Sequence, residues 1–247
     1  MPLQPLLRTL PLKITLAALA ALWIAPLLPL VAPLDRAAIR TTFDNFPLLR
    51  WYLNSLIATS ATTALVVATG SLAGYAFARI PFRGREPLFV AVLAALLVPP
   101  EITFIPLFLG FASLNLADTF VGLVLPQAAN VLTLYLFREF FAQLPQEIED
   151  AARVDGASRL GVFWRVVLPL SWPVLIAVAA LTFVGSWNNF LWPLIISTTD
   201  ATRTLPVGIA AYPSLAGATV TALPALLVFL LLSRHITRGV HFTGPRG

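Results

Sequence analysis

The sequence is organised as long apolar runs separated by short polar segments. A helix needs about 20 apolar residues to cross a hydrocarbon layer about 30 Å thick. Six runs approach or exceed this length, at residues 14–34, 53–78, 88–112, 119–137, 171–196 and 216–233. The pattern predicts an all-α membrane protein in which six transmembrane helices form a single domain over residues 1–247.

The composition agrees with this prediction and excludes several kinds of protein. Hydrophobic residues make up 58% of the chain and charged residues 11%, whereas soluble domains carry about 25% charged residues. The chain has no cysteine and two histidines, so we expect no disulfide framework, no metal site and no catalytic residue. The net charge of +5 is scattered between apolar runs, which argues against a nucleic-acid surface.

The basic residues also predict the orientation of the chain. If each run crosses the membrane, the connecting segments lie alternately on its two sides. Twelve of the 16 basic residues then fall on one side of the membrane and four on the other. The four are Arg36, Arg40, Arg50 and Arg203. The positive-inside rule then places both termini and the segment 143–169 in the cytoplasm.

The first two runs raise separate questions. Arg8 and Lys13 before the run 14–34 are also typical of an export signal, but the run is long and lacks a convincing cleavage site, so we expect a retained helix. In the second run, Gly70 and Gly74 have the GxxxG spacing that lets helices approach closely. We expect a contact within this chain in preference to a dimer interface.

The segment 143–169 is the only long polar one, and it predicts two short amphipathic helices. The first ends at Gly156, where a left-handed C-terminal cap is expected. Ser158 can then cap a second helix that carries Leu160, Phe163 and Trp164. A hairpin lying on the membrane surface has the same pattern.

The same segment contains a longer pattern: Asp150-Ala151-Ala152, two residues, Asp155-Gly156-Ala157, eight residues, and Val166-Val167-Leu168-Pro169. This pattern resembles the loop of the inner-membrane permease subunits of binding-protein-dependent ABC importers. The loop of that family reads E-A-A, two residues, D-G-A, eight residues, I-x-L-P. Further segments resemble the carbohydrate-uptake branch, which includes maltose-type and glycerol-phosphate-type permeases. They are residues 51–56, 74–85, 99–109, 187–195 and 203–208.

The resemblance implies that the loop docks a short coupling helix on a separate ATPase subunit. The candidate coupling residues are Glu149, Asp150, Ala151, Ala152, Asp155, Gly156, Ala157 and Pro169. The sequence contains no G-x-x-x-x-G-K-[ST] loop for nucleotide phosphates. ATP and Mg²⁺ are therefore expected on the partner ATPase, with no cofactor on this chain and no enzyme activity of its own.

Glu101 is the one acid that the apolar runs place within the membrane, directly after Pro99 and Pro100. Acids in the membrane are costly, so a carboxylate lining a solute path is one interpretation. The other is a residue near the outer interface that pairs with backbone groups freed by the two prolines.

Polar amides and aromatic rings near the end of the fifth run are the second set of candidates for a path. Trp187, Asn188, Asn189, Phe190 and Trp192 combine ring faces with amides, which suits sugars, although an interfacial aromatic belt has the same composition. Gln127 and Asn130 can likewise contact a solute or bond between helices.

The resemblance implies a permease subunit of an ATP-driven importer for a sugar, polyol or sugar-like phosphate. Its expected partners are a second, non-identical permease, two ATPase subunits, an external solute-binding protein and the lipid of a prokaryotic inner membrane. The alternative is a self-sufficient secondary transporter, which predicts internal repeats and further membrane carboxylates. A scaffold without transport activity leaves the loop pattern unexplained.

Overall fold

The computed structural model describes residues 46–211 together with Pro224 and Leu227. The predicted run 14–34 lies outside these residues, as does 216–233 apart from those two positions. All regular elements in the described part are helical.

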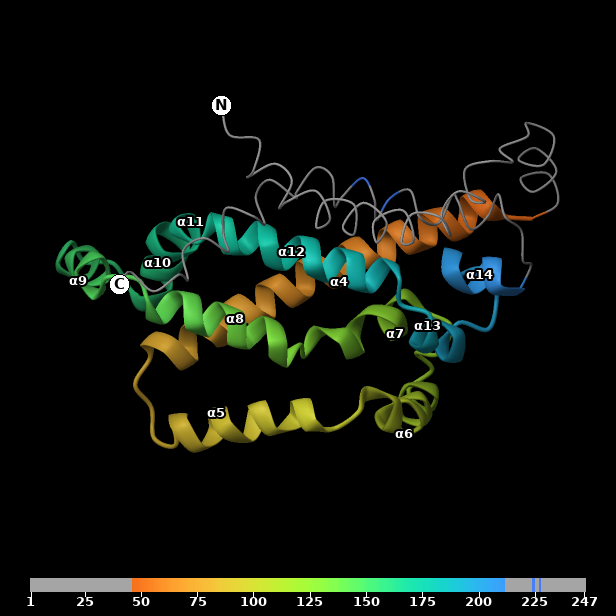
Figure 1. The fold of residues 1–247 in the computed structure, drawn as a ribbon, viewed down its shortest axis with the longest axis horizontal. Helices are drawn as coiled ribbons and strands as arrows, with labels where there is room; N and C mark the ends of the chain where they lie inside the picture. The colour runs from red at the N-terminus through yellow and green to blue at the C-terminus, as the bar shows by residue number, and fades with distance from the viewer. Residues whose placement is uncertain (1–45, 212–223, 225–226, 228–247) are drawn as a thin grey trace, which may run out of the picture.

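Helix α4 (Leu48–Arg79) is the central element, and α8 (Val131–Ala142) and α12 (Trp172–Trp187) both pack along it (Figure 1). The close approach of α8 depends on glycine. A Cβ at Gly70 would lie 2.5 Å from Cγ2 of Thr133, and one at Gly74 would lie 2.6 Å from Cβ of Phe137. This confirms that the GxxxG pair serves a contact within the chain.

Proline breaks bend two of the other predicted runs. The third run forms α5 (Arg85–Ala94) with the 3₁₀ turn η2 (Ala95–Leu97), and then turns by 97° into α6 (Pro100–Ser113). The fourth forms α7 (Phe120–Val124) and the 3₁₀ turn η3 (Leu125–Ala128), which meet α8 at 45°. Pro99 and Pro100 lie at the first break, because proline cannot donate the backbone hydrogen bond that continues a helix. Pro126 lies within η3, just before the second break at Ala129 and Asn130.

The fifth run is not one continuous helix. Helix α12 ends at Trp187, and α13 (Leu191–Ile196) begins after a break of three residues. Before α12, the chain turns by 79° at Ser171. By length and composition, the described residues contain one straight helix able to cross a membrane, or up to four spans if each bent pair is one span.

Buried aromatic residues hold the two ends of the bundle. At one end, Tyr75, Phe137, Phe141 and Phe163 form a cluster that also includes Val178 of α12. At the other end, one cluster contains Trp51 and Trp187, and a second contains Trp192. In Figure 1 these two ends lie at the left, near α9, and at the right, near α13.

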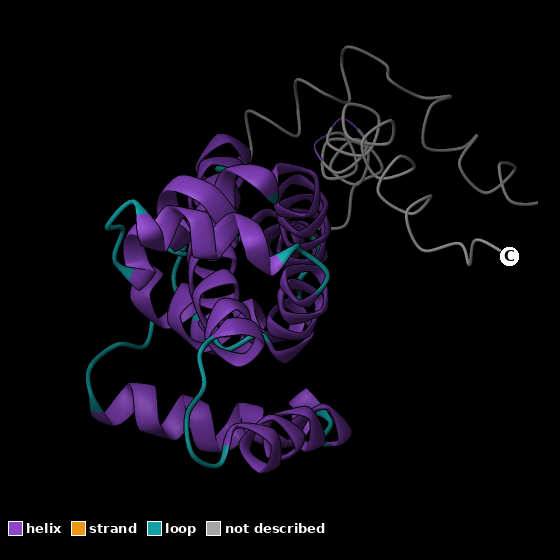
Figure 2. Ribbon diagram, turned by 90° about the vertical axis from the view of Figure 1, so that its left-hand side faces the viewer, coloured by secondary structure: helices purple, strands orange, loops and turns teal. Residues whose placement is uncertain are grey.

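Helices α5 and α6 form a layer below α8 in Figure 1 and Figure 2. The layer is attached near α5 by aromatic contacts. Phe89 lies 5.5 Å from Phe77 between ring centroids, and the guanidinium of Arg138 lies 4.4 Å from the centroid of the Phe89 ring. At its other end, α6 packs on Trp192 through Phe104, with ring centroids 5.9 Å apart.

Asp118, in the turn before α7, fastens the segment between α13 and α14 (Leu205–Ala211). Its carboxylate accepts hydrogen bonds from the backbone N–H groups of Thr198 and Thr199 and from the hydroxyls of Thr199 and Thr202. Burial opposes ionisation, but these hydrogen bonds outweigh it and lower the pKa of Asp118 to about 2. The Asp118 carboxylate is therefore ionised at neutral pH and keeps these hydrogen bonds.

Candidate functional site

The segment that resembles the permease loop protrudes from one end of the bundle. It consists of α9 (Gln146–Val154), a turn, α10 (Arg159–Val162), the π-helical turn η4 (Phe163–Val167) and α11 (Leu168–Leu170). The predicted helix, glycine turn and helix are thus present in the fold. Figure 1 places α9 and α10 at the end opposite α13 and α14.

The turn between α9 and α10 is built on Gly156, which has φ of +87°. The N–H of Ala157 donates to the carbonyl of Ala152 and the N–H of Gly156 donates to that of Arg153, each at 3.0 Å, which is the pattern of a Schellman cap. The hydroxyl of Ser158 accepts from the N–H of Gly161 at 3.1 Å and caps α10. Both ends of the turn are therefore fixed by hydrogen bonds.

The outer surface of this loop carries large apolar side chains that the described residues leave uncovered. Val154 is 87% exposed, Leu160 63% and Trp164 55%. The motif acids Asp150 and Asp155 are exposed as well, whereas Ala152 and Ala157 pack partly against the aromatic cluster of their own bundle. Ala151 and Pro169 are exposed. The exposed residues of this segment thus offer a partner chain both apolar and acidic groups.

Glu149 differs from the other motif residues because it points inward. It is the one buried residue of α9, at 8% exposed, and its Oε2 accepts a hydrogen bond from the hydroxyl of Tyr75 at 3.0 Å. Its Oε1 lies 3.1 Å from Nε of Arg79. The Nε–H of Arg79 is aimed at the carbonyl of Phe141, so the contact with Glu149 is an ion pair without a hydrogen bond.

Arg79 joins three elements at this position. Its guanidinium donates to the carbonyl of Phe141 at 3.0 and 2.6 Å and also to the carbonyl of Leu144. These carbonyls lie at and just beyond the C-terminal end of α8, where helix carbonyls lack intrahelical partners. The last basic residue of α4 therefore fixes α9 to both α4 and α8, a role that the sequence analysis did not identify.

The second candidate region is a cavity of about 600 Å³ toward the other end of the bundle. Its lining joins the N-terminal end of α6, the break after α7 and the break after α12. The candidate residues that line it are Glu101, Asn188, Asn189, Phe190 and Trp192, together with Gln127 and Asn130. Three helix breaks thus place polar side chains around one space.

Glu101 is exposed in the first turn of α6, and in the described part of the chain its carboxylate makes no hydrogen bond or ion pair. The predicted pairing of Glu101 with backbone groups freed by the two prolines is therefore not found among those residues. Asn189 contacts Gln127 at 3.5 Å between Nδ2 and Oε1 across the cavity. The indole N–H of Trp192 donates to the carbonyl of Gly122 at 3.1 Å, which fixes its ring.

Trp187 does not line this cavity. It is 1% exposed and packs in the cluster with Trp51, Leu48 and Leu205. Its ring lies 5.5 Å from that of Tyr52 and 6.1 Å from that of Phe183, between centroids. Among the six residues proposed for a path, Trp187 thus has the environment of a core residue.

Comparisons with known proteins agree with the features of this fold. The family described as binding-protein-dependent transport system inner membrane component matches residues 67–241. The arabinooligosaccharides transport system permease protein AraQ of Bacillus subtilis (strain 168) is 33% identical over 223 residues, which are 83% of this chain and 79% of AraQ. The sn-glycerol-3-phosphate transport system permease protein UgpE of Yersinia pestis bv. Antiqua (strain Antiqua) is 35% identical over 199 residues, which are 76% and 71% of the two chains.

A solved structure has the same fold. One chain of a bacterial ABC transporter involved in the import of the acidic polysaccharide alginate superposes with a TM-score of 0.83. The match covers 95% of this chain and 98% of that one at 18% identity. Because the family pattern extends over most of the sequence and includes the loop built on Gly156, the chain belongs to the inner membrane components of binding-protein-dependent transport systems.

Proposed function

We propose that this chain is the membrane-spanning permease subunit of an ATP-driven importer that takes up a sugar, polyol or sugar-like phosphate from an external solute-binding protein. The observation that carries the proposal is the loop from α9 to α11. In a member of this family, it forms a helix, a glycine turn and a helix at one end of the bundle, with Val154, Leu160 and Trp164 uncovered.

The sequence has no loop for nucleotide phosphates, and the loop from α9 to α11 has exposed apolar side chains. These two features support the following partners. ATP and Mg²⁺ bind to two separate ATPase subunits, which dock on the loop and move it as they close. A second, non-identical permease completes the path. AraQ is named for arabinooligosaccharides and UgpE for sn-glycerol 3-phosphate, which supports a carbohydrate-like solute.

The path for the solute includes the cavity lined by Glu101, Asn188, Asn189, Phe190 and Trp192. Its volume of about 600 Å³ is within the range of small-molecule sites in proteins, about 300–1,000 Å³. Amide groups and an aromatic face suit hydroxyl groups and sugar rings, respectively. We assign Trp187 to the core and not to the path.

The proposed topology has six spans with both termini and the loop in the cytoplasm. It is tested by cysteine labelling, which this cysteine-free chain permits without background. A membrane-impermeant thiol reagent is expected to label the Ala201→Cys variant in intact cells and the Val154→Cys variant only after permeabilisation. Both side chains are exposed in the fold, so the opposite pattern would show that the orientation is inverted.

The transport proposal is tested in proteoliposomes that contain the purified complex, with solute-binding protein and ATP supplied. We expect uptake that requires both, and it is measured for the wild type and for the Glu101→Gln variant. Glutamine keeps the size of the side chain but cannot take up and release a proton for coupling. Its amide can still form hydrogen bonds to hydroxyl groups in the path, so an ATP-driven importer is expected to retain uptake in this variant.

A secondary transporter gives a different result in the same experiment. It takes up solute along an ion gradient without ATP, and loss of a membrane carboxylate that couples protons abolishes uptake. Uptake without ATP, or its loss in Glu101→Gln with normal assembly and ATPase activity, contradicts the proposal.

A further inference from the structure

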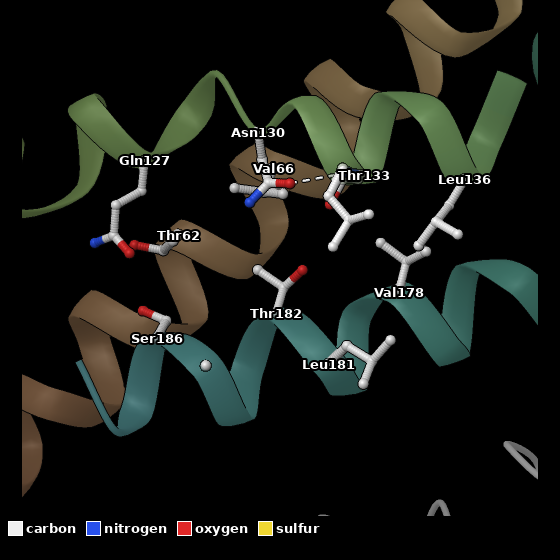
Figure 3. Close-up of a pocket in the computed structure, with 12 residues that line it drawn as sticks. Thr62, Val66, Gln127, Asn130, Thr133, Leu136, Val178, Leu181, Thr182 and Ser186 are labelled. Carbon is white, nitrogen blue, oxygen red and sulfur yellow. Dashed lines mark hydrogen bonds between the residues drawn. The ribbon is translucent and has the colours of Figure 1, made fainter. Parts of the chain in front are cut away.

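A second, narrower cavity lies between α8 and α12, on the side of α4 (Figure 3). Both helices pack on α4 but contact each other only weakly, which leaves a groove of about 200 Å³ with α4 as its floor. The groove continues from the larger cavity, because Gln127, Asn130 and Gly185 line both.

The groove has a polar lining although it lies within apolar spanning segments. Each of the three helices, or the turn before α8, contributes hydroxyl or amide groups. They belong to Thr62, Gln127, Asn130, Thr133, Thr182 and Ser186. Figure 3 shows Thr62, Gln127 and Ser186 gathered at one end, with Thr182 between them and the apolar end formed by Leu136, Val178 and Leu181. Lipid chains cannot satisfy such groups.

Thr62 gives the strongest indication of a ligand. It is 1% exposed, and its hydroxyl has no hydrogen-bond partner among the described residues. Leaving a buried hydroxyl without a partner is unfavourable, and most such groups in proteins do have one. A hydroxylated solute in the groove supplies the missing donor or acceptor.

The charge of the lining selects between classes of solute. Every described residue that lines the groove is uncharged, and Glu101 is the one charged residue that lines the larger cavity. A phosphate or carboxylate moved into such a groove loses its hydration without gaining a cation and is repelled by Glu101 on the way. A neutral polyol loses only hydrogen bonds, which the hydroxyls and amides replace.

We infer that the groove between α8 and α12 is a contact site for a neutral, polyhydroxylated solute, and that this subunit binds the solute with Thr62, Thr182 and Ser186. The inference rests on the proposed function and narrows its solute class to uncharged sugars or polyols.

The test compares Thr62→Val with Thr63→Val in the complete complex. Both threonines lie on α4, and neither hydroxyl has a hydrogen-bond partner among the described residues, but only Thr62 lines the groove. Initial uptake per ATP hydrolysed is measured at saturating binding protein, with arabinotriose, maltose and sn-glycerol 3-phosphate as probes. For a transported neutral probe, Thr62→Val is expected to lower this ratio about three- to tenfold, the effect of one hydrogen bond, and Thr63→Val to leave it unchanged.

Thermal unfolding separates binding from a structural role. Valine has nearly the shape of threonine and leaves no hydroxyl unsatisfied, so the unfolding midpoint of Thr62→Val is expected to equal or exceed that of the wild type. The inference is overturned if both valine variants transport alike, if Thr62→Val lowers only the midpoint, or if sn-glycerol 3-phosphate is the probe that is imported. Absence of ATP-driven uptake of every probe by the wild type instead overturns the proposed function, and the inference with it.

Discussion

Replacing Gly156 with valine is expected to uncouple ATP hydrolysis from uptake, lowering the solute imported per ATP at least tenfold while the spans remain folded. The φ of +87° is unfavourable for any side chain and most unfavourable for a β-branched one, at about 1–2 kcal/mol or more. A Cβ at this position meets no atom of the described residues within 4 Å, so the effect arises from the backbone and not from a clash. The turn must change, and the angle between α9 and α10 changes with it.

Gly84, in the turn between α4 and α5, is the matched control. It has φ of +80°, and a Cβ there also meets no atom within 4 Å. Gly84→Val therefore introduces a similar backbone strain outside the loop and is expected to keep the normal ratio of uptake to ATP hydrolysis. Uptake and ATPase activity are measured on both variants in proteoliposomes. A normal ratio in Gly156→Val, or the same loss in both variants, excludes the loop as the coupling element.

Replacing Arg79 with alanine is expected to detach α9 from the bundle and to abolish copurification of the ATPase. The change removes the ion-pair partner of Glu149 and the donor for the carbonyls of Phe141 and Leu144. The side chains of Arg79 and Glu149 are 12% and 11% exposed, and breaking a buried pair on one side costs about 3–5 kcal/mol. The measurements are thermal unfolding of the complex and the amount of ATPase retained in mild detergent.

Two further variants distinguish this network from a general loss of positive charge. Arg85→Ala removes an exposed pair with Glu86, of the kind that contributes about 0–1 kcal/mol, and is expected to behave like the wild type. The double variant Arg79→Ala with Glu149→Ala leaves no unpaired carboxylate at this position of α9 and is expected to retain more ATPase than Arg79→Ala alone. Equal losses in Arg85→Ala and Arg79→Ala contradict the anchoring role.

In the described part of the chain, apolar composition predicted helical segments but not where these helices bend. The transfer of a run into lipid depends on its summed hydrophobicity, which does not require one straight helix. Pro99 and Pro100 did indicate the break before α6, since proline interrupts the backbone hydrogen bonds. The break after Trp187 contains two asparagines and has no equally strong signal in the sequence.

The loop was the most predictable part of the site because its signals are local. Gly156 and Ser158 act on their own turn, through a positive φ and a helix cap. The partners of Glu149 could not be predicted in the same way, because Tyr75 and Arg79 lie 70 or more positions away along the chain. A basic residue at the end of an apolar run is already explained by the orientation of the chain in the membrane. The sequence therefore provided no reason to expect that Arg79 also anchors α9.

The cavity at Glu101 was less predictable from the sequence than the loop but more predictable than the partners of Glu149. The sequence identified most of its polar residues by type, but their convergence depends on the bends at Pro100 and Asn188. Trp187 and Trp192 are separated by the break between α12 and α13, which sends one ring into the core near Trp51 and the other to the cavity wall. Residue type alone did not distinguish them.

The aromatic clusters at the two ends of the bundle both hold α12, the helix that forms one wall of the groove between them. Helix α12 belongs to one cluster at Val178 and to the other at Trp187, nine positions further on, which is about 13.5 Å along a helix. Thr182 and Ser186 lie within this interval, on a stretch of α12 that is packed at each end and also along α4. This packing limits how far α12 can move, and therefore how much the width of the groove between α8 and α12 can change.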